Sequence, residues 1–199
     1  MASAIQCIPT AVSAQLYRFG FLDSNTREHG NRVARCSVAI GKHMALGAGD
    51  LDQLHTAALW HDIGKIAIEA RVLEKPGRLT QDEFELIKRH PIDGARLVRS
   101  FSRHILAGIE LHHERLDGSG YPYGLAGDRI PMTARIIAVA DTYDAITSHR
   151  PYQTAMSRGF AVQRIRSLAV SKLDPRVVAA LEIAVEFGCL FTEQNIAPN

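Results

Sequence analysis

Residues 61–65 read His-Asp-Ile-Gly-Lys and follow an apolar segment with helical spacing, in which Leu51, Leu54 and Ala58 recur on one face. Neighbouring residues of a helix project about 100° apart, so the imidazole of His61 and the carboxylate of Asp62 can reach one cation. The second oxygen of Asp62 can then bind another cation. Taken alone, the pair is more typical of a buried histidine with a hydrogen-bond partner beside a solvated aspartate.

Further imidazoles and one carboxylate accompany this pair along the chain. His29 lies on the preceding predicted helix, His90 closes a later one, and His112-His113 ends the next, whereas Asp141 interrupts an apolar helical segment. Each has a structural alternative: His29 as a surface residue, the other histidines as cations favoured at helix C-termini, and Asp141 as a buried group bonded to a backbone amide. Their joint occurrence favours a metal site over these alternatives.

The periodicity of the chain predicts an all-α fold. Asp50 and Thr80 are expected to cap two of the helices, with Phe84 and Ile87 facing inward, and Asp174 a third. The stretch 114–130 is too rich in glycine for a helix and is predicted to be a loop, after which Pro131 suits a first helical turn. The expected helices cover residues 12–22, 26–46, 50–63, 81–90, 91–100, 104–113, 131–141, 159–170 and 175–187.

Composition bounds the class of protein. A chain of 199 residues suits one domain, here expected as a short helical extension over 1–22 and a main domain over 23–199. The net charge of +2 argues against binding duplex nucleic acid. Cys7, Cys36 and Cys189 show no paired spacing, which favours a reducing cytoplasm, and neither a signal peptide nor a membrane span is expected.

Three segments carry a resemblance to a known family: HDIGK at 61–65, HHERLDGSGYP at 112–122 and ARIIAVADTYDAITSHRPY at 134–152. In this order they resemble the HD-GYP phosphodiesterases of cyclic di-GMP, from about residue 23 to about residue 187. The resemblance implies an HD-domain helical bundle with a two-metal site in its centre, and a cyclic dinucleotide as the substrate.

The family's metal ligands can be carried over position by position. The first ion would be held by His29, His61, Asp62 and Asp141, and the second by Asp62, His90, His112 and His113, so that Asp62 bridges the two. Imidazole and carboxylate ligands suit iron or manganese as well as zinc, and the resemblance favours iron or manganese. Some members hold a third ion on a glutamate where this chain has Asn25, so we expect two ions. Asp23 is expected to support the site or cap a helix.

The resemblance also implies the chemistry. Two cations can share a hydroxide that attacks phosphorus in line, and Lys65 would add positive charge next to Asp62 as the second catalytic residue. The expected substrate-binding residues are Arg115, Gly120, Tyr121, Pro122 and Arg150. The product would be linear pGpG, with GMP as a further product.

Alternatives remain for these residues. Lys65 can be an exposed lysine at a helix end, Arg150 a solvated loop charge, and Tyr121-Pro122 a stiff loop that docks a partner protein. Gln153 stands where the family often has a basic residue, which leaves both the affinity and the nucleotide preference open. Lys75 and Arg78 are equally candidates for a substrate rim and for plain surface charge.

Two other functions compete with this hypothesis. One is a different HD-superfamily phosphohydrolase or di-iron enzyme, against which the long 112–122 and 134–152 segments argue. The other is a catalytically silent module that binds cyclic di-GMP or a partner. A silent module is expected to have lost ligands, whereas every ligand position is filled in this chain.

Overall fold

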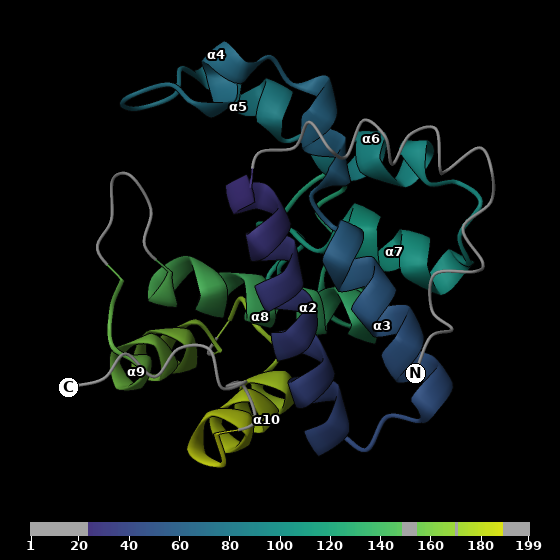
Figure 1. Cartoon of the computed structure of the whole chain (residues 1–199), viewed down its shortest axis with the longest axis vertical. Coiled ribbons are helices and arrows are strands. Elements are labelled where there is room, and N and C mark those ends of the chain that lie inside the picture. Colours follow the sequence, from purple (N-terminus) through teal and green to yellow (C-terminus); the bar gives the residue numbers. More distant parts are fainter. Residues whose placement is uncertain (1–23, 149–154, 170, 189–199) are drawn as a thin grey trace.

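The computed structural model describes residues 24–148, 155–169 and 171–188, and within these ranges the chain is helical and forms no β-strand (Figure 1). The all-α prediction is therefore confirmed. The elements, in chain order, are α2 (Ser24–His43), α3 (Ala48–Trp60), the 3-10 helix η1 (Ile63–Ala67), α4 (Ala70–Leu73), α5 (Gln81–Ile87), α6 (His90–Leu97), α7 (Arg103–Leu111), the 3-10 helix η2 (Gly127–Arg129), α8 (Met132–Thr147), α9 (Arg158–Leu168) and α10 (Pro175–Glu186).

Helix α2 runs through the middle of the bundle and packs against α3, α8 and α10 (Figure 1). Glycines allow the closest crossings. A Cβ at Gly30 would lie 2.9 Å from the Leu59 carbonyl oxygen of α3, and one at Gly108 of α7 would lie 2.8 Å from the Ala57 Cβ. Because carbon atoms normally stay about 3.5 Å apart or more, larger residues at these two positions would separate the helices.

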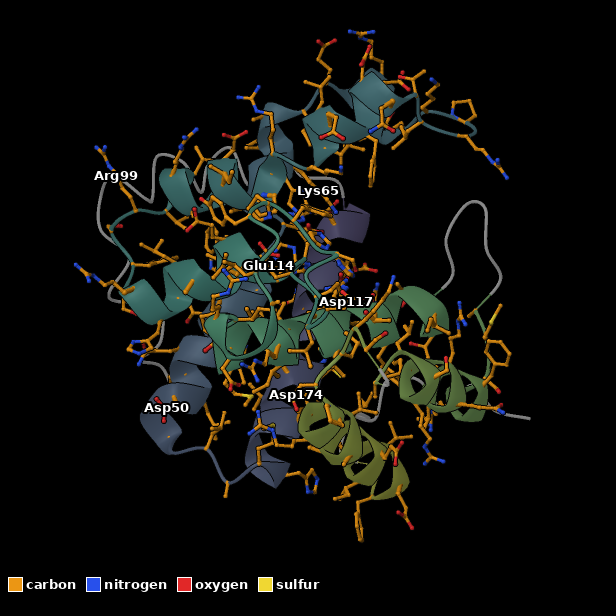
Figure 2. All side chains as sticks on the ribbon, turned by 180° about the vertical axis from the view of Figure 1, so that it is seen from behind. Asp50, Lys65, Arg99, Glu114, Asp117 and Asp174 are labelled. Atoms are coloured by element: carbon orange, nitrogen blue, oxygen red, sulfur yellow. The ribbon has the colours of Figure 1, made fainter. Side chains whose placement is uncertain are left out.

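Helix α8 forms the inner wall of the bundle. Every residue from Ala134 to Ala140 is buried, which explains why this segment is apolar at all positions but one. The one charged member, Arg135, donates to Asp174 across 2.9 Å and to the Ile130 carbonyl across 2.7 Å. Asp174 also caps α10, as predicted, by accepting from the Arg176 amide, and Figure 2 shows it at the start of that helix. This carboxylate therefore ties α10 to α8.

Helices α4 and α5 lie at one end of the molecule, away from the main bundle (Figure 1). The capping box at Thr80 is confirmed, since its side chain accepts from the Glu83 amide and Glu83 accepts from the Thr80 amide. The expectation that Phe84 faces inward is wrong: its side chain is 40% exposed. Ile87 is half-buried, and α5 contains no fully buried residue.

Several helix boundaries differ from the prediction, and two of these differences change the role of a predicted residue. Helix α3 begins at Ala48 with Gly47 as its N-cap, so Asp50 lies within the first turn, where its charge still favours the helix dipole. His90 does not close the helix that starts at Thr80; it opens α6, in which Pro91 suits the first turn. The helix expected over 12–22 lies outside the described residues. Within the described ranges, no helix is long and apolar enough to span a membrane.

Candidate metal centre

Seven histidine and aspartate side chains from separate elements converge in two groups. In each group the candidate ligand atoms lie within 4.8 Å of one another, as metal binding requires. The first group comes from α2, the end of α3, and α8, and consists of His29, His61 and Asp141. The second group surrounds the start of α6 and the end of α7, and consists of Asp62, His90, His112 and His113.

Asp62 faces both groups at once. Its Oδ1 atom is 3.2 Å from Nε2 of His90 in the second group. Its Oδ2 atom is 3.4 Å from Nε2 of His61 and 3.5 Å from Nε2 of His29, both in the first group. The carboxylate is buried, so its two oxygens are held in these two directions. This is the arrangement that a carboxylate bridging two cations needs.

The hydrogen bonds of three histidines fix their tautomers. In each of them Nδ1 lies 2.7 Å from the carbonyl oxygen of the residue three positions earlier. The pairs are His61 with Ala58, His90 with Ile87 and His112 with Ile109. A carbonyl can only accept, so each Nδ1 carries a proton, and Nε2 is the ring atom left to bind a metal ion.

The Nε2 atoms of these rings face other atoms that accept hydrogen bonds. Nε2 of His61 is buried with no hydrogen-bond partner among the described residues, and it faces a carboxylate oxygen. Nε2 of His90 faces Nε2 of His112 at 3.4 Å, and both are acceptors. Converging acceptors are unfavourable unless a cation lies between them. The residues present therefore fit divalent metal ions, with His61 on one side of Asp62 and His90 and His112 on the other.

His29 is oriented differently from these three. Its Nδ1 atom is 2.7 Å from Oδ2 of Asp144, and Asp144 also accepts from Arg32 across 2.6 and 3.0 Å. Its Nε2 atom points to Asp141 at 3.3 Å. Burial lowers the pKa of His29, but the hydrogen bonds with Asp141 and Asp144 raise it to about 9. A surface role for His29 is wrong, since its side chain is only 13% exposed.

The adjacent imidazoles of His112 and His113 are held neutral. Burial lowers the pKa of His113 to about 3, and burial together with the neighbouring histidines holds the pKa of His112 well below its usual range. They are therefore not cations placed at a helix C-terminus. Asp62 stays ionised although burial opposes it, because Lys65 and His61 hold its pKa well below the usual range, and Lys65 Nζ donates to its Oδ2 across 2.6 Å.

The loop from 114 to 130 packs directly on the histidine pair. The Tyr121 ring stacks on the His113 ring, with centroids 4.6 Å apart and planes inclined by 28°. Glu114 is buried and accepts from the amides of Tyr123 and Leu125 across 2.8 and 2.9 Å, which folds the loop back on itself. Figure 2 shows Glu114 and Asp117 in this loop, between α7 and α8. The loop is therefore a wall of the centre.

Comparison with known proteins identifies the family. The profile of the HD domain matches residues 19–177, most of the chain. The chain belongs to the HD-domain family. The resemblance seen in the sequence is thus confirmed. We call the two groups of candidate ligands joined by Asp62 the HD centre.

Relatives of this HD domain are cyclic dinucleotide phosphodiesterases by name. The cyclic di-GMP phosphodiesterase response regulator RpfG of Xanthomonas campestris pv. campestris is 41% identical over 165 residues, covering 81% of this chain and 44% of that protein. The 3'3'-cGAMP-specific phosphodiesterase 3 of Vibrio cholerae is 35% identical, covering 80% and 35%. The chain thus spans less than half the length of these relatives.

A solved structure shares the fold of this HD domain. The HDG"Y"P protein Bd1817 of Bdellovibrio bacteriovorus superposes with a TM-score of 0.67 at 20% identity, covering 87% of this chain and 57% of that one. At this identity the likeness establishes the helical arrangement alone.

The predicted substrate-binding residues differ in where the structure places them. Arg115 is close to the centre, where its Nη1 donates to the carbonyls of His112 and Glu114 across 3.2 and 2.9 Å. Lys75 pairs with Glu83 across 2.6 Å within the α4–α5 arm, and Arg78 is exposed there. Roles on a substrate rim stay a prediction for both. Arg150, Gln153, Asp23 and the side chain of Asn25 lie outside what the structure describes.

Two residues of the centre were missed by the sequence analysis. Asp144 orients His29, and its position three residues after Asp141 was a usable signal, because that spacing places both on one helix face. Glu114 anchors the loop, but no periodicity distinguishes a buried loop glutamate from a solvated one. The partner of Asp144, Arg32, lies three residues after His29 and follows the same spacing.

Proposed function

We propose that this HD domain is a phosphodiesterase that hydrolyses cyclic di-GMP to linear pGpG, with GMP as a further product. The observation that carries the proposal is Asp62, whose two oxygens face the Nε2 atoms of two groups of histidines. The relatives add the substrate class, since RpfG is named as a cyclic di-GMP phosphodiesterase.

The ions that we propose for the centre are two divalent cations, iron or manganese. Five imidazoles and two carboxylates, with no thiolate among them, suit these ions well. When bound, such ions supply Lewis acidity toward the phosphate and activate water for attack at neutral pH. The bridging ligand would be Asp62, with His29, His61 and Asp141 on one side and His90, His112 and His113 on the other.

The protein's own charges would bind and orient the phosphodiester. Lys65 donates to buried Asp62 while 30% of its side chain stays exposed, so its ammonium group can also reach a phosphate oxygen. Arg115 uses only Nη1 in the contacts described above, which leaves Nε and Nη2 for a phosphate or a guanine edge. The guanidinium group of Arg150 would bind a further phosphate oxygen or guanine edge. Gly120, Tyr121 and Pro122 would shape the wall of the substrate site.

The direct test is incubation of the purified chain, loaded with manganese or iron, with cyclic di-GMP, followed by chromatography of the products. We expect pGpG to form, and the Asp62→Asn variant to form none while remaining folded. Asp52→Asn, an exposed aspartate on α3, is the matched control and should keep full activity. A chain with two bound ions and no linear product would contradict the proposal.

A mixed cyclic dinucleotide is the second candidate substrate. It is favoured by the relative named as specific for 3'3'-cGAMP, which is 35% identical to this chain. Equal concentrations of both dinucleotides in one reaction would separate the candidates, because the ratio of the initial rates gives the ratio of kcat/KM. We expect cyclic di-GMP to be hydrolysed faster.

The same proposal includes a cytoplasmic location and a second use of the 114–130 loop as a docking site for a partner protein. Exposed Tyr123, with 55% of its surface accessible, supports docking, while the stacking of Tyr121 on His113 supports a role in the site.

A catalytically silent module would not need two ions. Elemental analysis that finds about two ions per chain, together with turnover, would exclude it.

A further inference from the structure

A second recess lies apart from the ligand groups. It is a cavity of about 750 Å³ enclosed by the end of α3, η1, α4, α5 and α6. None of the seven candidate metal ligands lines it. Its size is typical of small-molecule sites, which commonly measure about 300–1,000 Å³. Its floor is apolar and is built by Trp60, Ile63, Ile66, Val72, Leu86 and Leu97.

The rim of this cavity carries an excess of positive charge. Arg89, Arg96 and Arg99 line it together with Asp93. Asp93 is shared between Arg96 at 3.4 Å and Arg89 at 3.9 Å, distances that are long for charge-assisted hydrogen bonds. Among the described residues none forms an ion pair with Arg99, whose side chain extends outward after α6 (Figure 2). The other acid of the rim, Glu69, is already bound by Arg71.

We propose that this cavity binds a small anion with an apolar body, such as an acyl or aromatic carboxylate. The apolar floor would take the body, because removing apolar surface from water is favourable. The guanidinium groups of Arg96 and Arg99 would take the carboxylate, which arginine binds in a two-pronged geometry. A neutral or cationic amphiphile gains nothing from this rim.

The first residues of the chain are a poor alternative occupant. Residues 1–22 are apolar enough to fill a groove, but they contain no aspartate or glutamate, and Arg18 is their only charged side chain. They would bring a positive charge to a positive rim. The charge of the rim thus selects an external anion.

The cavity shares its walls with the HD centre. Ile63 and Ile66 belong to η1, which follows Asp62, and Asp93 and Leu97 belong to α6, which begins at His90. These two elements touch through their backbones: a Cβ at Gly64 would lie 1.9 Å from the His90 carbonyl oxygen. An occupant of the cavity therefore contacts η1, which directly follows Asp62, and α6, which begins at His90.

The chain contains its own reporter for this site. Trp60 is the only tryptophan in the sequence and lines the cavity, so its fluorescence reports an occupant directly. The probe is dodecanoate, and dodecyltrimethylammonium is the cation of equal chain length. We expect dodecanoate to change the Trp60 emission in a saturable way at micromolar concentrations and to raise the Tm by mass action. The cation should bind at least about tenfold more weakly.

Variants of the rim and floor test the position of the ligand. Arg96→Gln with Arg99→Gln should weaken dodecanoate binding about tenfold or more. Arg35→Gln with Arg164→Gln removes the same charge from exposed positions outside the cavity and should leave binding unchanged. Ala67→Phe adds volume at an exposed position of the lining and should abolish saturable binding without disturbing the core.

Three results would overturn the proposal. The first is no saturable change in Trp60 emission, as expected if a segment of this chain fills the cavity. The second is equal binding of the cation and the anion. The third is unchanged binding in the Arg96→Gln, Arg99→Gln variant. Each is independent of hydrolysis, so the proposed phosphodiesterase activity stands or fails separately.

Discussion

Replacement of Gly120 by alanine tests whether the 114–130 loop shapes the HD centre. A Cβ at this position would lie 2.4 Å from the Glu114 Cα, 2.5 Å from the Arg115 amide nitrogen and 2.5 Å from the His113 carbonyl oxygen. All three are backbone atoms, so no rotamer change can relieve the contact. Since non-bonded carbon atoms normally stay about 3.5 Å apart, the loop must move by about 1 Å.

That movement has two calculable costs. Overpacking of this kind typically destabilises a protein by about 1–3 kcal/mol, which should appear as a lower free energy of unfolding. It would also shift Tyr121 away from the His113 ring, on which it stacks at 4.6 Å. A displacement of about 1 Å at a reacting site can lower the rate about 10²-fold, so we expect a loss of that order in kcat.

The assay compares urea unfolding and cyclic di-GMP hydrolysis for Gly120→Ala and for Gly49→Ala. Gly49 lies in the first turn of α3 and a Cβ there meets no atom within 4 Å. Its replacement should leave activity unchanged and raise stability by up to about 1 kcal/mol, because alanine is the better helix former. If the Gly120→Ala variant is as stable and as active as the unaltered chain, the reasoning is refuted. Docking of a partner would then be the remaining role of the loop.

Three further predictions concern charge. In metal-free protein, stability should peak near pH 6.5 in urea unfolding, with slopes of about 1.4 kcal/mol per pH unit per group. Below that pH the histidine at position 113 binds a proton in the unfolded chain but not in the folded one, where its pKa is about 3, so stability falls as the pH is lowered. Above it, the stability that protonated His29 contributes is lost as the pH rises to its folded-state pKa of about 9. A monotonic profile from pH 4 to 9 would contradict this. Asp144→Asn should lower the pKa of His29 in an NMR titration, whereas exposed Asp52→Asn should not; an unchanged value would show that Asp144 does not set it. Lys65→Met should keep both ions by elemental analysis yet lose about 10²-fold or more in kcat, and full activity would remove Lys65 from the mechanism.

The sequence predicted the members of the centre better than their support. Histidines at the ends of apolar segments and Asp141 inside one are visible because they break a hydrophobic pattern. Asp144 breaks the same pattern three residues later and was still missed, since its role depends on Arg32 and His29 from a helix far away in the chain. Its spacing from Asp141 places it on the same helix face, but its pairing with side chains of α2 has no period that a single sequence displays.

Boundary errors had local causes. Asp50 has the right side chain for an N-cap, but the backbone turns earlier, with Ala45 at a positive φ of 58° and Gly47 extended as the actual cap. Phe84 was assigned to the core by its position in a helical pattern. Helix α5 contains no buried residue, so the pattern there does not correspond to burial, and part of it lines the arginine-rimmed cavity through Leu86.

The ends of helices explain why this fold suits cations. His61 follows α3, His112 follows α7 and His90 comes shortly after α5, and each bonds through Nδ1 to one of the last carbonyls of the helix before it. These carbonyls lack helical partners, so they are available to fix the tautomer that leaves Nε2 bare. The same ends carry the negative pole of the helix dipole, which favours positive charge. Convergence of three helix ends thus prepares both the ligand atoms and the local potential before any ion arrives, and the backbone contributes as much to the centre as the side chains that a sequence motif displays.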